Sequence, residues 1–220
     1  MENVNVLYED NHITVCEKPP LVLSQKDQKG ATADLCSMLD EQTGTEHRPV
    51  HRLDLGVGGT MVYARTQRSA AALSAFIQDN KLTKEYLAVV HGIPAENEGV
   101  YRDLLFKDSS KNKSFVVDRQ RKGVKEASLE YKVLQTAETE KGVLTLVQIK
   151  LHTGRTHQIR VQFSSRRTPL YGDGKYGSRT NEKCIALWSY RLSFPHPVSK
   201  KNMSFESLPG NTFPWNAFVF

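Results

Sequence analysis

Residues 51–59 read HRLDLGVGG, and they lead into residues 60–64, which read TMVYA. Three glycines among nine residues predict a loop, and the apolar run that follows predicts a strand able to hold that loop in place. The loop carries one carboxylate, Asp54, and its glycines allow another molecule to approach the backbone closely. An aspartate in such a loop is usually a turn or capping residue, so this stretch alone assigns it no chemistry.

The N-terminal half predicts a hairpin and two helices around this loop. Residues 4–17 alternate polar and apolar types on either side of a turn, which is typical of a hairpin. One helix is expected to be capped by Thr32 and to end at Gly44, and another is expected to follow Thr66. Their buried faces are expected to be Leu35, Met38 and Leu39 in the first, and Ala70, Leu73, Phe76 and Ile77 in the second.

The C-terminal half is richer in strands. Residues 85–91, 128–134 and 143–151 predict strands, and Thr156 is expected to cap a short helix with Ile159 and Phe163 on one face. No repeat or linker marks a boundary within the 220 residues. We therefore expect an α+β fold, a largely antiparallel mixed sheet with flanking helices, in a single domain over residues 1–220.

Composition places the chain among ordinary folded proteins. It has 39% hydrophobic and 25% charged residues, and no stretch long and apolar enough to span a bilayer. The first twenty residues lack the apolar block of a signal peptide. Three widely spaced cysteines fit reduced thiols better than a disulfide framework, so we expect a cytoplasmic protein.

The formal net charge of +6 suits a polyanionic partner without identifying one. Part of this charge is concentrated in residues 107–125, which we expect to be a loop. A solvated surface and a phosphate-contacting surface are about equally good interpretations of this basic run.

Several other chemistries are disfavoured by spacing. His47 and His51 have helical i,i+4 spacing, but Pro49 between them argues against a metal-binding helix, and His152 and His157 lack companions at zinc-like spacing. The sequence holds no phosphate-binding loop, no G-x-S-x-G elbow and no paired C-x-x-C motif. No metal site is therefore predicted.

Three longer segments together resemble the RluA family of pseudouridine synthases over nearly the whole chain. They are residues 8–20, from YEDN to EKPP; residues 51–54, HRLD; and residues 154–161, GRTHQIRV, followed by LYGD at 170–173. The resemblance implies a pseudouridine synthase catalytic domain with a central RNA-binding cleft. Some members carry an N-terminal S4 domain, for which we expect no room here because the first motif begins almost at Met1.

One departure concerns the loop itself. The family often follows its catalytic aspartate with x-x-T-S-G, whereas residues 55–59 read LGVGG. Two hydroxyl groups are lost at positions that are expected to shape the loop rather than to break bonds.

The resemblance also implies roles for single residues. Asp54 corresponds to the catalytic carboxylate, Arg160 to the arginine that pairs with it, and Tyr86 to the active-site tyrosine that stacks on uracil or assists proton transfer. The expected RNA- and substrate-binding residues are His51, Arg52, Arg155, His157 and Gln158. Arg52 is expected to take the space of the extruded base or to contact phosphate, and His51 to orient the loop rather than to act as a general base.

Isomerising uridine requires breaking the N1–C1′ bond, turning the uracil and joining C5 to C1′. No cofactor and no metal is intrinsically needed, and one carboxylate suffices either as a nucleophile at C1′ or as a base at C2′. The expected partner is ribosomal or transfer RNA, acted on by a monomer. Two alternatives remain at this point: a catalytically idle RNA-binding module, and a sugar- or base-modifying hydrolase of another kind, for which Asp54 lacks a matching second acidic group.

Overall fold

A computed structural model describes residues 3–27 and 32–220. The chain divides into two compact units. The first unit comprises Met1–Lys84 and Trp188–Pro209, and the second comprises Glu85–Leu187 and Gly210–Phe220. The single catalytic domain expected over residues 1–220 stays a prediction.

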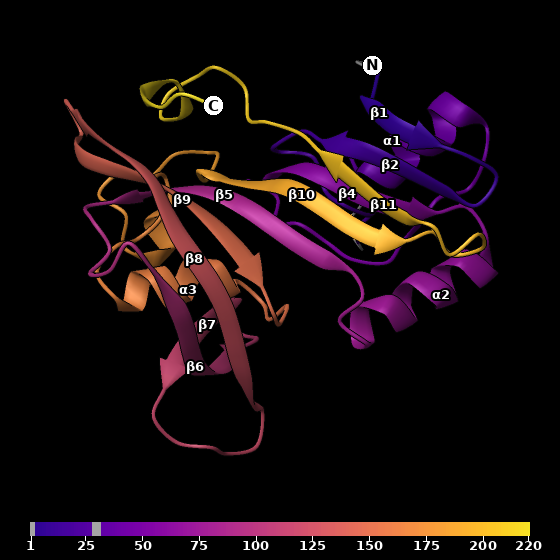
Figure 1. Cartoon of the computed structure of the whole chain (residues 1–220). Coiled ribbons are helices and arrows are strands. Elements are labelled where there is room, and N and C mark those ends of the chain that lie inside the picture. The colour runs from indigo at the N-terminus through magenta and orange to yellow at the C-terminus, as the bar shows by residue number, and fades with distance from the viewer. Residues whose placement is uncertain (1–2, 28–31) are drawn as a thin grey trace. The chain divides into compact units, whose positions relative to one another are not determined.

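The first unit is built on a mixed sheet (Figure 1). Its strands lie in the order β1 (Val6–Glu9), β2 (Ile13–Lys18), β4 (Gly58–Ala64) and β10 (Leu187–Pro195). The short β3 (Arg48–Pro49) pairs with β4, and β11 (Asn202–Glu206) pairs with β10. β1 and β2 form the predicted opening hairpin, and β10 runs parallel to β4, while the other pairs are antiparallel.

Helix α1 (Leu35–Thr43) begins two residues later than the sequence predicts. Its cap is Asp34, whose Oδ1 accepts a hydrogen bond from the Ser37 backbone N–H at 3.0 Å, so the cap expected at Thr32 is wrong. An aspartate can satisfy a free N–H of the first turn as well as a threonine can, and here it is Asp34 that has the required extended backbone. Gly44 ends the helix in the left-handed conformation, with φ of 69°, as predicted.

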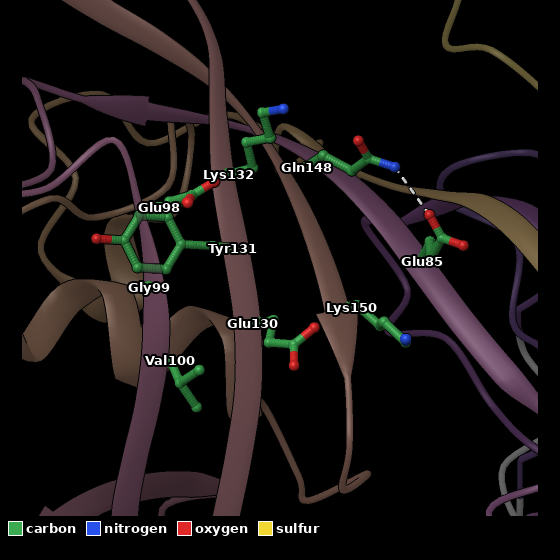
Figure 2. A pocket seen from close by; sticks show the side chains of 9 residues that line it. All are labelled: Glu85, Glu98, Gly99, Val100, Glu130, Tyr131, Lys132, Gln148 and Lys150. Atoms are coloured by element: carbon green, nitrogen blue, oxygen red, sulfur yellow. Dashed lines mark hydrogen bonds between the residues drawn. The ribbon is translucent and has the colours of Figure 1, made fainter.

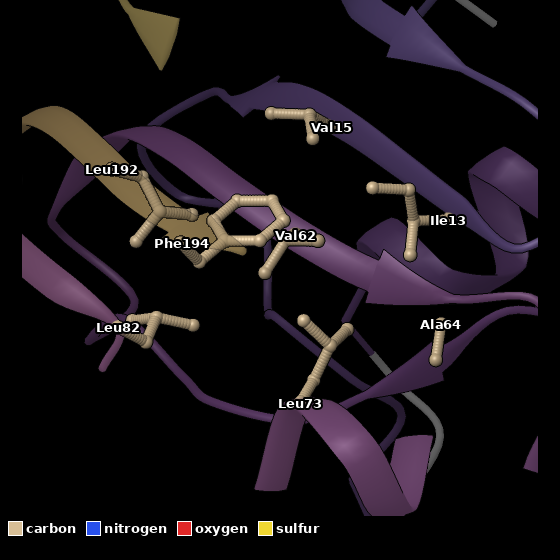
Figure 3. Close-up of a cluster of buried hydrophobic side chains, with 8 residues drawn as sticks. All are labelled: Ile13, Val15, Val62, Ala64, Leu73, Leu82, Leu192 and Phe194. Carbon is tan, nitrogen blue, oxygen red and sulfur yellow. The ribbon is translucent and has the colours of Figure 1, made fainter. Parts of the chain in front are cut away.

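Helix α2 (Gln67–Gln78) matches its prediction closely. The Thr66 hydroxyl accepts a hydrogen bond from the Ser69 N–H at 3.1 Å, which confirms the predicted cap. Figure 3 shows Leu73 of this helix pointing toward the side chains of the sheet. The buried cluster comprises Ile13, Val15, Val62, Ala64, Leu73, Leu82, Leu192 and Phe194, with Ala70, Phe76 and Ile77 packed against it.

The second unit has a sheet in the order β5 (Thr83–His91), β9 (Gly142–Leu151), β8 (Val124–Thr139), β6 (Glu98–Asp108) and β7 (Lys113–Val117). The first two residues of β5 belong to the first unit. β5, β8 and β9 contain the three strands predicted for residues 85–91, 128–134 and 143–151. The basic run 107–125 is not the expected loop, because it contains all of β7 and the ends of β6 and β8.

Helix α3 (Gln158–Ser165) is preceded by His157 in the left-handed conformation, with φ of 52° and no side-chain cap. The cap expected at Thr156 is therefore wrong. Ile159 and Phe163 are buried as predicted. Two short 3-10 helices, η1 (Gly174–Tyr176) and η2 (Trp215–Ala217), complete the described elements.

Two glycines allow β4 to lie close to β10. A Cβ atom on Gly58 would lie 2.3 Å from Cζ3 of Trp188, and one on Gly59 would lie 2.4 Å from the Ser189 carbonyl oxygen. Gly59 also has a φ of 113°, which disfavours any side chain. The departure from the family pattern at position 58 therefore has a structural reason, since the Trp188 ring fills the space that a serine would need.

The observed strands and helices confirm the α+β class with a largely antiparallel mixed sheet. In the described part of the chain, no helix has the length and apolar character needed to cross a membrane.

Candidate active site

A buried lysine, Lys18, holds the loop that carries Asp54. Lys18 is fully buried at the end of β2, and its ammonium group donates to the carbonyl oxygens of Pro19, Val22 and Leu55 at 2.9, 2.6 and 3.4 Å. A charged group in this position requires several acceptors, because burial removes its hydration. Lys18 therefore ties the chain after β2 to the residue that follows Asp54.

Ser24 provides a second attachment for the loop. Its hydroxyl accepts from the Leu53 N–H at 3.0 Å and lies 3.1 Å from the Leu53 carbonyl oxygen. The Ser24 carbonyl in turn accepts from the Tyr63 hydroxyl at 2.7 Å. The backbone on the N-terminal side of Asp54 is thus fixed to β4 through a buried polar chain.

The residues of the loop differ from one another in exposure. Arg52 and Leu55 are exposed, Asp54 is half-buried, and Leu53 is buried. The Asp54 carbonyl accepts from the Val57 N–H at 3.0 Å, which closes a backbone turn over residues 54–57. The loop therefore presents a carboxylate and a guanidinium group on a backbone that is firmly held.

His51, the first residue of the loop, is buried, and its predicted role in orienting the loop stays a prediction. Its Nε2 accepts a hydrogen bond from the Val62 N–H of β4 at 3.3 Å. Burial, and secondarily the charge of Lys84, hold the pKa of His51 well below its ordinary value. The imidazole is therefore neutral at neutral pH.

Tyr86, the predicted active-site tyrosine, lies in the part of β5 that belongs to the second unit. Its side chain is buried. Successive residues of a strand point to opposite faces, so Tyr86 and its neighbour Glu85 lie on opposite faces of β5.

In the second unit, Gln158 fixes the segment that precedes α3. Its Oε1 accepts from the Arg155 N–H at 3.0 Å and from the Thr153 hydroxyl at 2.7 Å, while its Nε2 donates to the Ser128 carbonyl at 3.1 Å. Arg155 is exposed, and its Nε donates to the Glu126 carbonyl at 2.8 Å. Gln158 thus holds residues 153–158 against β8, and the RNA contact predicted for it stays a prediction.

Arg160 forms a buried two-pronged ion pair with Asp173. Its Nε lies 2.6 Å from Oδ2 and its Nη2 lies 2.8 Å from Oδ1, and both side chains are almost completely buried. The planar guanidinium group matches the carboxylate geometry that this arrangement requires. The sequence did not predict this partner, although Asp173 ends the LYGD string at 170–173.

Tyr176 joins two of the predicted residues. The Arg160 guanidinium lies over its ring at 5.0 Å, and Nδ1 of His157 lies 2.9 Å from its hydroxyl oxygen. The hydroxyl also accepts from the Ser114 N–H at 2.8 Å, and burial raises the pKa of Tyr176. The sequence analysis did not name Tyr176. Its only signal in the sequence is its position just after Gly172, Asp173 and Gly174, which assigns it no role.

A pocket of about 480 Å³ on the second unit has none of the predicted site residues in its lining (Figure 2). Its polar lining consists of Glu85, Glu98, Glu130, Tyr131, Lys132, Gln148 and Lys150. The register sets Glu98 opposite Lys132 and Glu130 opposite Lys150, and Gln148 donates to Glu85 at 2.8 Å. Acidic side chains outnumber basic ones, so this pocket does not have the charge that phosphate binding needs.

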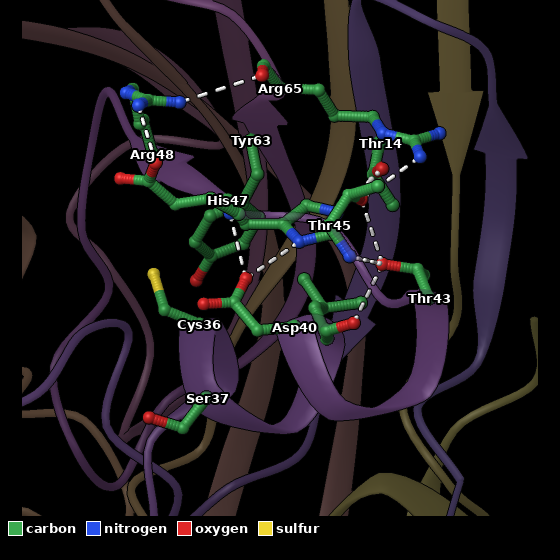
Figure 4. Close-up of polar contacts among 12 residues, drawn as sticks. Thr14, Cys36, Ser37, Asp40, Thr43, Thr45, His47, Arg48, Tyr63 and Arg65 are labelled. Atoms are coloured by element: carbon green, nitrogen blue, oxygen red, sulfur yellow. Dashed lines mark hydrogen bonds and ion pairs between the residues drawn. The ribbon is translucent and has the colours of Figure 1, made fainter.

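His47, considered above as a metal ligand, takes part in a buried network in the first unit (Figure 4). Its Nδ1 lies 2.9 Å from Oδ1 of Asp40, and its Nε2 lies 2.9 Å from the Thr14 hydroxyl. Asp40 is partly exposed, but Thr14 and His47 are buried, so no substrate reaches the threonine hydroxyl of this Thr-His-Asp arrangement. The network attaches β3 and α1 to β2.

The predicted residues thus fall into two groups. His51, Arg52 and Asp54 share one loop of the first unit, whereas Tyr86, Arg155, His157, Gln158 and Arg160 belong to the second unit. Within the second unit, Tyr176 brings His157 and Arg160 together. The pairing of Asp54 with Arg160 stays a prediction.

Comparisons with known proteins agree with the motifs. Residues 12–165 match the family model described as RNA pseudouridylate synthase, and the match runs through both units. The chain is 34% identical to an uncharacterized RNA pseudouridine synthase of Aquifex aeolicus, over 96% of this chain and 71% of that protein. It is 29% identical to ribosomal large subunit pseudouridine synthase D of Zymomonas mobilis, over 93% of this chain and 68% of that protein.

Among solved structures, human RNA pseudouridylate synthase domain containing 1 has a similar fold. The TM-score is 0.81 at 22% sequence identity, covering 97% of this chain and 86% of the human chain. Fold, motif order and family match point the same way, and the chain therefore belongs to the RNA pseudouridylate synthase family, as an RluA-type RNA pseudouridine synthase.

Proposed function

We propose that Asp54 is the catalytic carboxylate of this synthase and that Tyr86 and Arg160 act with it. The observation that carries the proposal is the way Asp54 is presented. Its side chain is half-buried, on a loop whose backbone is fixed by Lys18 on one side and Ser24 on the other. Holding a reacting group in one geometry is a main source of catalytic rate.

The reaction needs no oxidant and no net transfer of atoms. The N1–C1′ bond of uridine breaks, the uracil turns while it stays bound, C5 joins C1′, and the proton lost from C5 is balanced by one gained at N1. Asp54 serves either as a nucleophile at C1′ or as a base at C2′, and Tyr86 stacks on the uracil. The proposed role of Arg160 is to orient the carboxylate, supported by the rigidity that Asp173 gives to its guanidinium group.

The proposed RNA contacts divide by exposure. Arg52 and Arg155 are exposed cations suited to phosphate or to the space left by an extruded base. His157 contributes from the N-terminus of α3, while His51 and Gln158 hold the segments that carry Arg52 and Arg155.

The proposed substrate is a specific uridine of ribosomal or transfer RNA, isomerised by a cytoplasmic monomer without metal or cofactor. One relative at 29% identity is named for the ribosomal large subunit, which supports the ribosomal choice without selecting the nucleotide. Pseudouridine mapping across the transcriptome of cells with and without this protein identifies the RNA, and an excess of chelator is expected to leave turnover on that RNA unchanged.

The variant Asp54→Asn tests the assignment. We expect single-turnover pseudouridine formation on the mapped RNA to fall by at least about 100-fold, which is the usual scale for losing a catalytic acid or base. RNA affinity should stay close to that of the wild type, since phosphate contacts dominate it.

The matched control is Asp79→Asn, which removes an exposed carboxylate that pairs with Lys81 in the same unit. This variant should react at the wild-type rate. Near-wild-type turnover in Asp54→Asn, with an unchanged thermal midpoint, would remove Asp54 from its proposed role.

A further inference from the structure

Lys84 is a largely buried cation in β5, at the end of the first unit and two residues before Tyr86. Burial lowers the pKa of Lys84 to about 8, and its ammonium group has no hydrogen-bond or ion-pair partner among the described residues. Lys84 keeps some exposed surface, unlike the fully buried Lys18, but the described part of the protein gives its ammonium group no acceptor, which is unusual for a cation so largely removed from water.

His51 provides a second hydrogen-bond donor that has no acceptor within the residues that the structure describes. Because its Nε2 accepts the Val62 N–H, that nitrogen carries no proton, and the neutral ring carries its proton on Nδ1. Nδ1 is buried and has no hydrogen-bond partner among the described residues. A buried donor without an acceptor is destabilising and is rare in folded proteins.

The two groups lie near each other in the first unit. Val50, which precedes His51, packs against the buried cluster that contains Leu82, two residues before Lys84. Figure 3 shows Leu82 in that cluster together with Val62, whose N–H binds His51. The charge of Lys84 is also felt by the imidazole, since it lowers the pKa of His51 in addition to the larger effect of burial.

One kind of ligand satisfies both groups. A neutral carbonyl would accept the hydrogen bonds but leave the charge of Lys84 uncompensated, whereas an anionic oxygen supplies both. In a substrate made of RNA, the anionic oxygens are those of the phosphodiester backbone. His51 lies three residues from Asp54 in the same loop, so this phosphate would belong to a nucleotide at or next to the reacting one.

We propose that Lys84 Nζ and His51 Nδ1–H together form a subsite that binds one backbone phosphate beside the target uridine. This inference rests on the proposed function for the identity of the substrate. It assigns to Lys84 a role that the sequence did not predict, and it narrows the RNA contact expected of His51 to one phosphate. It also explains why a lysine is tolerated in this position, since the subsite is incomplete until RNA is bound.

The test measures affinity without turnover, using uridine, uridine 5′-monophosphate and uridine 3′-monophosphate as probes of the full-length protein. In the wild type, one of the two monophosphates should bind at least about tenfold more tightly than uridine, the usual scale of one charge-assisted hydrogen bond. In ¹⁵N-histidine-labelled protein, that monophosphate should shift the Nδ1–H resonance of His51, and uridine should not.

Three variants complete the experiment. Lys84→Met should bring the affinity ratio close to one, Lys84→Arg should retain most of it, and Lys81→Met, which changes an exposed lysine three residues earlier, should leave it unchanged. Lys84→Met should also melt at a higher temperature than the wild type at pH 7, because it no longer buries an uncompensated charge. A lysine that only supports the fold would give the opposite shift.

Three results would overturn the inference. They are equal affinity for uridine and both monophosphates in the wild type, an affinity ratio that survives Lys84→Met, and an Nδ1–H resonance of His51 that does not move when the monophosphate binds. These outcomes are separate from the fate of the proposed function, since Asp54→Asn protein should show the same affinity ratio while failing to isomerise RNA.

Discussion

The loop at residues 51–57, which carries Asp54, and the segment at residues 153–160 both contain family motifs, but they are built in opposite ways. In the loop, the groups that hold the backbone come largely from elsewhere, from Lys18 and Ser24, and Arg52 is left exposed. In the segment, the motif side chains themselves hold the fold, since Gln158 binds β8 and Arg160 binds Asp173.

A motif position therefore does not indicate by itself whether a residue meets the substrate. Under the proposed function, Asp54 and Arg52 of the loop meet the substrate, so the loop needs support from other segments. The segment can support itself because buried amide and guanidinium groups satisfy nearby carbonyls and carboxylates. We therefore expect the loop to be disturbed most by substitution of Lys18, which lies outside it. The segment should be disturbed most by substitution of its own motif residues.

The strongest loss is expected from Lys18→Met. The substitution keeps the apolar length of the side chain but leaves the carbonyls of Pro19, Val22 and Leu55 without their donor. We expect the free energy of unfolding to fall by about 2–5 kcal/mol, since several buried acceptors become unsatisfied at once. Urea denaturation measures the loss, and single-turnover kinetics at low temperature should show a slower reaction in the remaining folded protein.

Lys26→Met is the control for this experiment, because Lys26 is an exposed lysine in the same unit. It should change neither the denaturation midpoint nor the rate. If Lys18→Met were as stable as this control, the loop would be held mainly by Ser24, and the two regions would no longer differ in where their support comes from.

A smaller effect on stability, with a clear effect on rate, is expected from Arg160→Lys. Lysine keeps the charge but cannot make both bonds to Asp173, so the free energy of unfolding should fall by about 1–3 kcal/mol. If Arg160 also orients Asp54, single-turnover kinetics should show a slower reaction than the stability loss explains.

Asp173→Asn separates the two roles of Arg160. It weakens the same ion pair from the other side while leaving the guanidinium group in place. We expect this variant to lose similar stability and to retain a higher single-turnover rate than Arg160→Lys. Equal rates in the two variants would mean that Arg160 only supports the second unit, as Gln158 does.

The sequence predicted those elements whose signal is local. The cap at Thr66, the end of α1 at Gly44 and the strands within β5, β8 and β9 follow from periodicity and capping chemistry. β10 and β11 were missed, and the helix cap at Thr156 was wrong. The left-handed His157 binds Tyr176, nineteen residues away, and no window of neighbouring residues contains that contact.

The same reasoning applies to the site. The motif resemblance named Asp54, Tyr86 and Arg160, but it did not indicate that Lys18 supports the loop or that Asp173 binds Arg160. Such pairs join segments far apart in sequence, and a single sequence carries no record of them. The proposed role of Lys84 could not be predicted either. It depends on the burial of this lysine and on its lack of a partner among the described residues, and a sequence pattern shows neither property.

The mildest effect is expected from the basic run, which we expect to contribute to binding but not to chemistry. Arg119, Arg121 and Lys122 are exposed between β7 and β8. Arg121 lies over the Phe106 ring at 5.1 Å, whereas Arg119 and Lys122 make no ion pair among the residues that the structure describes. The last two are therefore better suited to bind phosphate than Arg121.

Reversing all three charges to glutamate should weaken RNA binding and flatten the dependence of log Kd on log salt by about 0.7–0.9 for each phosphate that the protein no longer neutralises. Reversing only Arg119 and Lys122 should produce most of this change, and the rate at saturating RNA should not fall, because these residues do not hold the loop at residues 51–57. The matched control reverses the exposed Lys26, Lys141 and Lys201 and so changes the net charge equally. If both triple variants flatten the salt dependence to the same degree, the basic run contributes only to the general field of the protein, and RNA is bound chiefly by the exposed arginines of the two motifs.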